Sequence, residues 1–194
     1  MAIYYYRYVM QRTDLVAIFM VLLNGSTALG IFLFSRLSKR IGKKKLTMIS
    51  FLLTGVFQIL IYFADYENIT AIMILTVLTG LMRFGLPVAT AMLADVIDYS
   101  EDRTGIRADG TAYSVYSFGT KLSSALVGTV GVLLLARTGY VANIIQPPQV
   151  MKGINMIVNI LPGACWLIAL IPLFFYNLSE DTCKEIRKRL DDRV

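Results

Sequence analysis

Five apolar segments of membrane-spanning length constrain this chain more than any other feature of its sequence. A helix needs about 20 apolar residues to cross the hydrocarbon core of a bilayer. With 56% hydrophobic residues and a mean hydropathy of +0.62, the 194-residue chain is too apolar for a soluble domain. The sequence therefore predicts an all-α integral membrane protein, with a transmembrane helical bundle at 1–177 and a short helical tail at 178–194. The five predicted spans are 15–34, 46–64, 69–94, 111–136 and 154–176.

Basic residues follow the first, third and fifth segments and are sparse elsewhere. Thirteen lie on that side of the predicted membrane and four on the other, which is the bias typical of cytoplasmic loops. We therefore expect a multi-pass protein of the cell membrane (inner or plasma membrane), with its N-terminus outside and its C-terminus in the cytoplasm. Because topology accounts for the net charge of +6, the expected partner is membrane lipid and not nucleic acid. The thirteen are Arg36, Lys39, Arg40, Lys43, Lys44, Lys45, Arg103, Arg107, Lys184, Arg187, Lys188, Arg189 and Arg193, and the four are Arg7, Arg12, Arg137 and Lys152.

The tail at 178–194 has the pattern of a short amphipathic helix. Ser179 is the predicted N-cap, because the acidic residues Glu180 and Asp181 follow it and basic residues come later, which matches the helix dipole. We expect the helix to pack its narrow apolar stripe against the cytoplasmic face of the bundle. The stripe consists of Cys183, Ile186, Leu190 and Val194.

The sequence lacks the residue patterns of most enzyme sites. It contains no histidine, and its two cysteines lie in different surroundings, Cys165 in an apolar run and Cys183 in the charged tail. A disulfide framework is therefore not expected. Neither a nucleophile–base pair, a metal-binding cluster nor a phosphate-binding loop can be recognised. We predict a protein that is not an enzyme and that carries no metal or cofactor.

Lys121 is an ionisable group deep within an apolar segment. It lies ten residues into the fourth segment, which at 1.5 Å per residue is roughly 15 Å below its end, and a snorkelling side chain covers only part of that distance. Ser114, Ser117, Ser124 and Gly128 share its helical face, a pattern that fits either a helix–helix seam or the lining of a cavity. The lysine favours a cavity and an acidic partner. Since this chain has no acid at mid-depth, we expect that partner on another polypeptide or on an absent half of the protein.

Arg83 is the second cation within an apolar segment. It lies near the middle of the third segment, four residues before Pro87, which can open a helix and expose its carbonyls. Arg83 is a candidate to bind a substrate carboxylate or hydroxyls, or to neutralise an acid from outside this chain. A purely structural ion pair is an equal alternative.

Charges of both signs crowd the 98–110 loop. Asp95, Asp98, Arg103 and Arg107 are candidates for ion pairs that close a cytoplasmic gate in one conformational state. A solvated loop without function is the alternative.

Tyrosines are concentrated at the start of the chain. They fit an aromatic belt at the membrane interface, and they equally fit an outward mouth where rings stack on a sugar. The four are Tyr4, Tyr5, Tyr6 and Tyr8.

Several of these residues lie in strings that resemble a known family. The strings are Ala94-Asp95-Val96-Ile97-Asp98-Tyr99, Arg103-Thr104-Gly105-Ile106-Arg107-Ala108-Asp109-Gly110 and Ser117-Phe118-Gly119-Thr120-Lys121. They are similar to motifs of the glycoside–pentoside–hexuronide:cation symporter family, of which the melibiose carrier is a member, within the major facilitator superfamily. The similarity extends to the Tyr-Tyr element at 4–5, the basic loop at 36–45, the turn at 138–141 and the tail.

The resemblance implies a twelve-helix transporter with two six-helix halves that works by alternating access. This chain resembles the C-terminal bundle, from the outer tip of the seventh helix through the twelfth. A coupling cation, Na⁺ or H⁺, is then expected, with its carboxylates and most sugar ligands in an N-terminal half outside this chain. Lys121 matches the family lysine that lies near the sugar and cation sites. The candidate substrate and coupling residues are Lys121, Arg83, Ser117, Ser124, Tyr5 and Thr120.

The sequence thus predicts the C-terminal part of a cation-coupled sugar symporter, inactive without the missing N-terminal six-helix half, with a sugar as substrate. The alternative is a non-transporting membrane interaction or scaffold protein, or a truncated paralogue. In that case Lys121 and Arg83 pair with acids of a partner.

Overall fold

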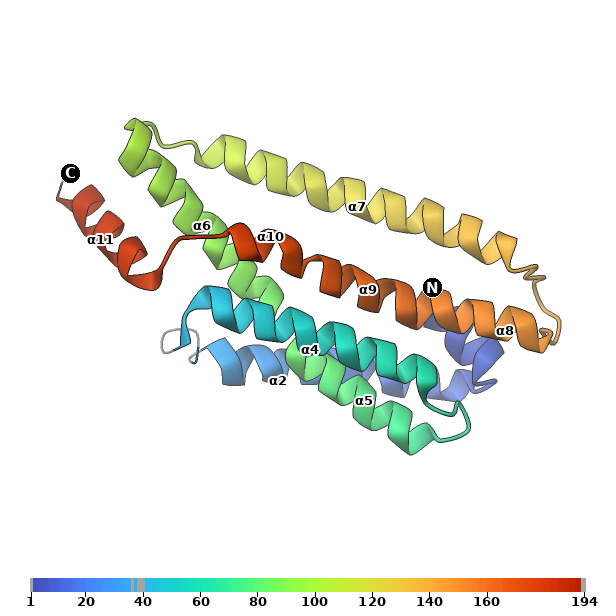
Figure 1. Cartoon of the computed structure of the whole chain (residues 1–194). Helices are drawn as coiled ribbons and strands as arrows, with labels where there is room; N and C mark the ends of the chain where they lie inside the picture. Colours follow the sequence, from blue (N-terminus) through green and yellow to red (C-terminus); the bar gives the residue numbers. More distant parts are fainter. Residues whose placement is uncertain (1, 36, 38–40, 193–194) are drawn as a thin grey trace.

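The structure is a computed structural model that describes residues 2–35, 37 and 41–192 (Figure 1). The described part of the chain is helical and holds five helical stretches long and apolar enough to cross a membrane, which confirms the predicted fold class. Predicted residues that lie outside the described part are Arg36, Lys39, Arg40, Arg193 and Val194. The five stretches are Thr13–Phe34, Lys43–Phe63, Ile69–Thr104, Asp109–Arg137 and Pro148–Phe175.

The chain enters the bundle through two short helical turns, α1 (Ala2–Tyr4) and the π-helical η1 (Tyr5–Val9). A 3-10 turn, η2 (Thr13–Leu15), then leads into α2 (Val16–Ser35). Tyr5, Val9 and Phe19 are buried in one apolar core with residues of the later helices.

Three helices pack closely at the centre of the bundle: α2, α4 (Lys43–Phe63) and α5 (Ile69–Met82). Gly80 of α5 faces α2 so closely that a Cβ there would overlap the Ser26 hydroxyl. Small residues allow this approach because dispersion contacts, and not the hydrophobic effect, hold helices together within a membrane. Asn68 begins α5 as an N-cap, since its side-chain oxygen accepts a hydrogen bond from the Ala71 N–H at 3.0 Å.

The third span is broken in its middle. Helix α5 ends at Met82, and α6 runs from Gly85 to Thr104. Pro87 causes the break, because it has no N–H and its ring displaces the carbonyl of Arg83, four residues earlier. Ser50 of α4, fully buried, bridges the gap: its hydroxyl accepts a hydrogen bond from the Gly85 N–H at 2.8 Å and donates one to the Met82 carbonyl.

The region predicted as a 98–110 loop is mostly helical. Helix α6 continues past the predicted end of the third span at residue 94, and α7 (Asp109–Arg137) begins four residues after Gly105. Gly105 closes α6 in the left-handed conformation, at φ 71°. The charges of this region therefore lie along the end of α6 and not in a flexible connection.

Helix α7 lies along one flank of the bundle (Figure 1). Its buried residues are Gly131 and Leu135, towards its C-terminal end. The hydroxyls of Thr90 on α6 and Tyr116 on α7 are 3.4 Å apart. Most of the other side chains of α7 are exposed.

The last span is built from four helical pieces, and its irregular points precede two prolines. It consists of α8 (Pro148–Asn155), the π-helical η3 (Met156–Ile160), α9 (Leu161–Ile168) and α10 (Leu170–Phe175). Pro162 lacks the N–H that would bond the Val158 carbonyl, and that carbonyl instead accepts from the Gln58 side chain at 3.5 Å.

The tail forms α11 (Glu180–Asp191), which packs on α6. As predicted, Ser179 is its N-cap and accepts a hydrogen bond from the Thr182 N–H at 3.1 Å. Cys183 and Ile186, two members of the predicted apolar stripe, are buried. Glu180 also caps α4, since its side chain accepts a hydrogen bond from the Lys43 N–H at 2.8 Å.

Candidate functional site

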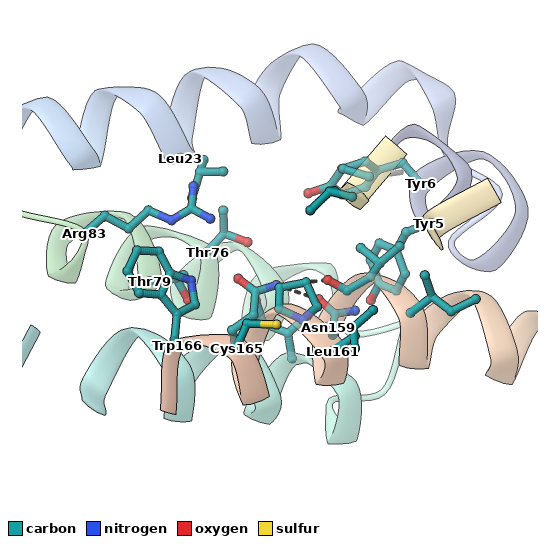
Figure 2. Close-up of a pocket in the computed structure, with 18 of the residues that line it drawn as sticks. Tyr5, Tyr6, Leu23, Thr76, Thr79, Arg83, Asn159, Leu161, Cys165 and Trp166 are labelled. Atoms are coloured by element: carbon teal, nitrogen blue, oxygen red, sulfur yellow. Dashed lines mark hydrogen bonds between the residues drawn. The ribbon is translucent and has the colours of Figure 1, made fainter. Parts of the chain in front are cut away.

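A cavity of about 690 Å³ lies between the helices of the bundle, and we call it the main pocket (Figure 2). Side chains from α1, η1, α2, α4, α5, α7, η3 and α9 line it. Most of the lining is apolar, and the polar or aromatic side chains are therefore few and specific. Those are Tyr5, Tyr6, Gln58, Thr76, Thr79, Arg83, Asn159, Cys165 and Trp166.

Arg83 is the charged member of this lining. It sits where α5 stops, and Figure 2 shows its guanidinium directed into the space between α2 and α5, near Leu23 and Thr76. Its Nε is buried without a hydrogen-bond partner, and no acid of the described residues forms an ion pair with it. The structural ion pair considered for Arg83 is therefore not formed within the described part of this chain.

A chain of amide side chains runs along one wall of the main pocket. Asn159 donates to the Asn155 side-chain oxygen at 2.7 Å and accepts from Gln58 at 3.0 Å. Asn155 in turn donates to the Tyr62 carbonyl at 3.2 Å. Sequence reasoning missed these three side chains. Their signal was a pair of asparagines four residues apart within an apolar span, since polar groups at that depth need internal partners.

The tyrosines at the start of the chain divide into two groups. Tyr5 and Tyr6 line the main pocket. Tyr5 is only 2% exposed, and its buried hydroxyl has no hydrogen-bond partner among the described residues. Tyr4 and Tyr8 instead pack against Tyr140, with ring centroids 5.4 and 5.1 Å away. The Tyr140 hydroxyl donates to that of Tyr8 at 2.9 Å. This second group holds the chain entry to the α7–α8 connection.

Lys121 lies away from the main pocket. It is exposed on α7, in a shallow depression beside Tyr113 and Ser117. No ion pair to Lys121 occurs among the described residues. The side chains by which α7 reaches the main pocket lie farther along the helix, at Leu126, Val127, Val130 and Gly131.

The other predicted site residues of α7 share the exposed position of Lys121. The Thr120 hydroxyl donates to the Ser117 carbonyl at 2.8 Å, and the Ser124 hydroxyl donates to the Thr120 carbonyl at 2.9 Å. The predicted substrate residues therefore form two groups. Arg83 and Tyr5 both line the main pocket, whereas Lys121, Ser117, Ser124 and Thr120 lie on the open side of α7.

A dense set of ion pairs surrounds the end of α6, and we call it the α6 charge cluster. Asp95, whose side chain is only 1% exposed, accepts from Lys43 Nζ at 2.5 Å and from Arg187 at 2.8 Å. Arg187 also contacts Asp98 at 3.2 Å, and Arg107 contacts Asp98 at 3.4 Å. The cluster thereby joins α4, α6, α11 and the α6–α7 connection.

Arg107 contacts three carboxylates of the α6 charge cluster, on Asp98, Glu101 and Asp109. It contacts Asp109 and Glu101 at 2.6 Å each, and these hydrogen-bonded carboxylates raise the pKa of Arg107 above its usual value. Arg103 lies over the Tyr99 ring at 5.4 Å, outside these pairs. The structure thus brings together the predicted Asp95, Asp98 and Arg107, adds Lys43 and Arg187, and leaves Arg103 aside.

Comparison with known proteins shows a match to one family and similarity to several of its transport proteins. The family model described as MFS/sugar transport protein matches residues 1–180. The chain is 30% identical to the glucuronide carrier protein homolog of Escherichia coli (strain K12), over 99% of this chain and 42% of that protein. It is 32% identical to a putative sulfoquinovose importer of the same organism (98% and 41%) and 35% identical to the uncharacterized symporter YnaJ of Bacillus subtilis (strain 168) (98% and 42%). The chain therefore spans about two fifths of the length of these relatives.

Proposed function

The chain belongs to the MFS/sugar transport protein family, and we propose that it is the C-terminal part of a cation-coupled sugar symporter that works by alternating access. The observation that carries this proposal is the main pocket inside a multi-pass membrane bundle, which is lined by the half-buried Arg83 and by Tyr5. The Arg83 Nε and the Tyr5 hydroxyl have no hydrogen-bond partner among the described residues. Polar groups that lack hydrogen-bond partners within a membrane bundle are typical of a substrate path. The names of the relatives, a glucuronide carrier and a symporter, support the same class.

In this proposal the bundle supplies one wall of a cavity, and an N-terminal six-helix half supplies the other. The open face of α7 supports this division, because Lys121 and its neighbouring serines are exposed on a helix of membrane-spanning length. A cation in that position needs an acid to offset its desolvation. The facing half would contribute that acid, the ligands of the coupling Na⁺ or H⁺ and further sugar contacts. Lys121 would link sugar and cation occupancy through its charge.

The α6 charge cluster supplies a candidate gate. Its ion pairs join four separate segments of the bundle through Asp95 and Asp98. Rigid elements joined by pairs of this kind can separate in a second state, in which the pairs exchange for water. With the basic loops placed in the cytoplasm, the cluster would close the cytoplasmic side of the cavity while the outside is open.

Uptake measurements test the proposal. The chain is expressed in membrane vesicles with and without the N-terminal six-helix half of a relative, and sugar uptake is followed under an imposed Na⁺ or proton gradient. We expect gradient-driven uptake with both halves and none with this chain alone. Uptake by this chain alone would contradict the division into two halves, and equal uptake with and without the gradient would contradict symport.

Replacement of Lys121 in the two-half protein tests its role. Lys121→Ala is expected to abolish uptake or to separate it from the cation gradient, because the charge that senses both ligands is gone. Lys152→Ala is the matched control, since Lys152 is an exposed cation on α8, the helix that follows α7. Normal coupling in Lys121→Ala would remove the assigned role.

The open face of α7 also favours a second candidate function, a non-transporting membrane scaffold whose partner covers that face. The DNA upstream of the gene separates the two. An adjacent six-helix reading frame supports the transporter, whereas a promoter and start site without such a frame support the scaffold.

A further inference from the structure

The main pocket carries a single charge. Of its lining residues, Arg83 is charged, and none is acidic. The Arg83 guanidinium is half-buried, and its Nε is shielded from water without a hydrogen-bond partner among the described residues. This desolvation costs free energy, which a bound anion would offset. The lining therefore favours an occupant that brings its own negative charge.

The chemistry of arginine narrows that occupant further. Its planar fork of N–H donors matches oxyanions with two or more equivalent oxygens, such as carboxylates, phosphates and sulfonates. Nothing among the described residues competes for these donors, since Arg83 forms no ion pair or side-chain hydrogen bond there. Its place at the break between α5 and α6 fixes the guanidinium at the edge of the cavity.

The rest of the pocket suits the body of a sugar. Figure 2 shows Tyr5 entering from the end opposite Arg83, with Trp166, Cys165 and Asn159 along the wall between them. Aromatic rings of this kind can pack on the apolar face of a sugar ring, and both Tyr5 and Trp166 belong to the lining. The Asn159 oxygen is already bonded to Gln58, so that wall is held rigid.

We propose that the main pocket binds an acidic sugar, with Arg83 holding its carboxylate or sulfonate and Tyr5 contacting the opposite end. This inference rests on the proposed function and deepens it, because it selects anionic over neutral sugars. Two relatives whose printed names refer to an anionic sugar, glucuronide and sulfoquinovose, are consistent with it. Arg83 is then the residue that determines charge specificity.

Cys165 provides a direct readout, because it lines the same pocket and is exposed. The 194-residue chain with Cys183→Ala is placed in lipid nanodiscs, and the rate of Cys165 alkylation by neutral N-ethylmaleimide is measured with glucuronate, sulfoquinovose or glucose. We expect the two acidic sugars to slow the reaction and glucose at the same concentration to leave it unchanged. The carboxylate and sulfonate arms show which oxyanion fits better.

Variants of Arg83 decide whether the arginine is responsible. In Arg83→Gln we expect the concentration for half-protection to rise about 10- to 100-fold, the loss typical of a charge-assisted hydrogen bond. Arg83→Lys keeps the positive charge but lacks the planar pair of N–H donors, so we expect weaker protection that is still measurable. It also serves as the second variant if Arg83→Gln fails to fold. Lys152→Gln, outside the pocket, should match the parent chain.

Three results would overturn the inference: equal protection by glucose, full protection by acidic sugars in Arg83→Gln, or no protection by any sugar. The last result would mean that the main pocket of this chain does not bind a sugar. Failure of the proposed function looks different, because it appears as absent uptake in the two-half protein while the acidic sugars still protect Cys165. Uptake restricted to neutral sugars would leave the proposed function standing and remove the acidic substrate.

Discussion

At the scale of single residues, Ser50 holds the broken third span together. Its hydroxyl satisfies one donor and one acceptor that the break between α5 and α6 leaves open, on Gly85 and Met82. Within a membrane no water can replace these bonds, so each unpaired group would cost free energy.

Ser50→Ala therefore has a clear expected effect. Loss of the bridge leaves a buried N–H and a buried carbonyl unpaired, and we expect the free energy of unfolding to fall by about 1–3 kcal/mol. Unfolding in mixed micelles with increasing denaturant, followed by Trp166 fluorescence, measures the change. Ser114→Ala is the control, because Ser114 is exposed on α7. An unchanged midpoint in Ser50→Ala would show that other groups satisfy the break.

The same break shows what sequence could and could not foretell about the site. Pro87 identified the opened helix, and Arg83 was recognisable as a cation in an apolar segment. Ser50 was not recognisable, because a hydroxyl in a span usually bonds its own preceding turn. Its role depends on α4 crossing the break at that residue, which is a tertiary fact. The same holds for Gln58, which finds Asn159 about a hundred positions away.

At the scale of elements, α11 is attached to the bundle by charge and by a small apolar contact. Arg187 pairs with Asp95 and Asp98, while Cys183 and Ile186 are buried beneath the helix. Burial, with the nearby Asp95 carboxylate, raises the pKa of the Cys183 thiol. Since the thiolate is the reactive form, docking should keep Cys183 slow to alkylate.

Arg187→Ala is expected to loosen the docking of α11 on α6. The buried Asp95 keeps Lys43 as a partner, while α11 loses its two contacts with Asp95 and Asp98 and keeps the Arg189–Asp102 pair at 3.0 Å. Cys183, in a chain with Cys165→Ala, should then react faster with maleimide at pH 7.5, because its pKa returns towards the ordinary value and the thiolate fraction rises. Lys184→Ala is the matched control, since its pair with Asp181 is largely exposed. Equal rates in both variants would show that the apolar contact and the Arg189–Asp102 pair hold the helix without Arg187.

The limits of these elements show which local sequence patterns predicted the structure and which did not. The five spans followed from apolar length, and Ser179 followed from its acidic neighbours, because both signals are local. The sequence predicts a loop at 98–110 because the charges there break the apolar pattern. In the structure the acids Asp95, Asp98 and Glu101 continue α6, where cations from other segments offset them. Charge pairing between distant segments is what local patterns cannot show.

At the scale of the whole molecule, α7 is the longest helix of the described residues. Its 29 residues correspond to roughly 43 Å at 1.5 Å per residue, enough to cross a bilayer with its headgroup regions. An isoleucine is exposed in the connection at each end, Ile106 between α6 and α7 and Ile145 between α7 and α8. These two positions report on the orientation of the protein.

The basic residues predict which end faces the cytoplasm. Ile106 lies beside Arg103 and Arg107, on the side that also holds the tail, whereas the Ile145 side has few cations. In a chain with Cys165→Ala and Cys183→Ala, we expect a membrane-impermeant maleimide to label Ile145→Cys in intact cells. Ile106→Cys should react only after the membrane is permeabilised. The reverse pattern would invert the topology and move the α6 charge cluster to the outer face, and labelling of both in intact cells would mean that α7 does not span the bilayer.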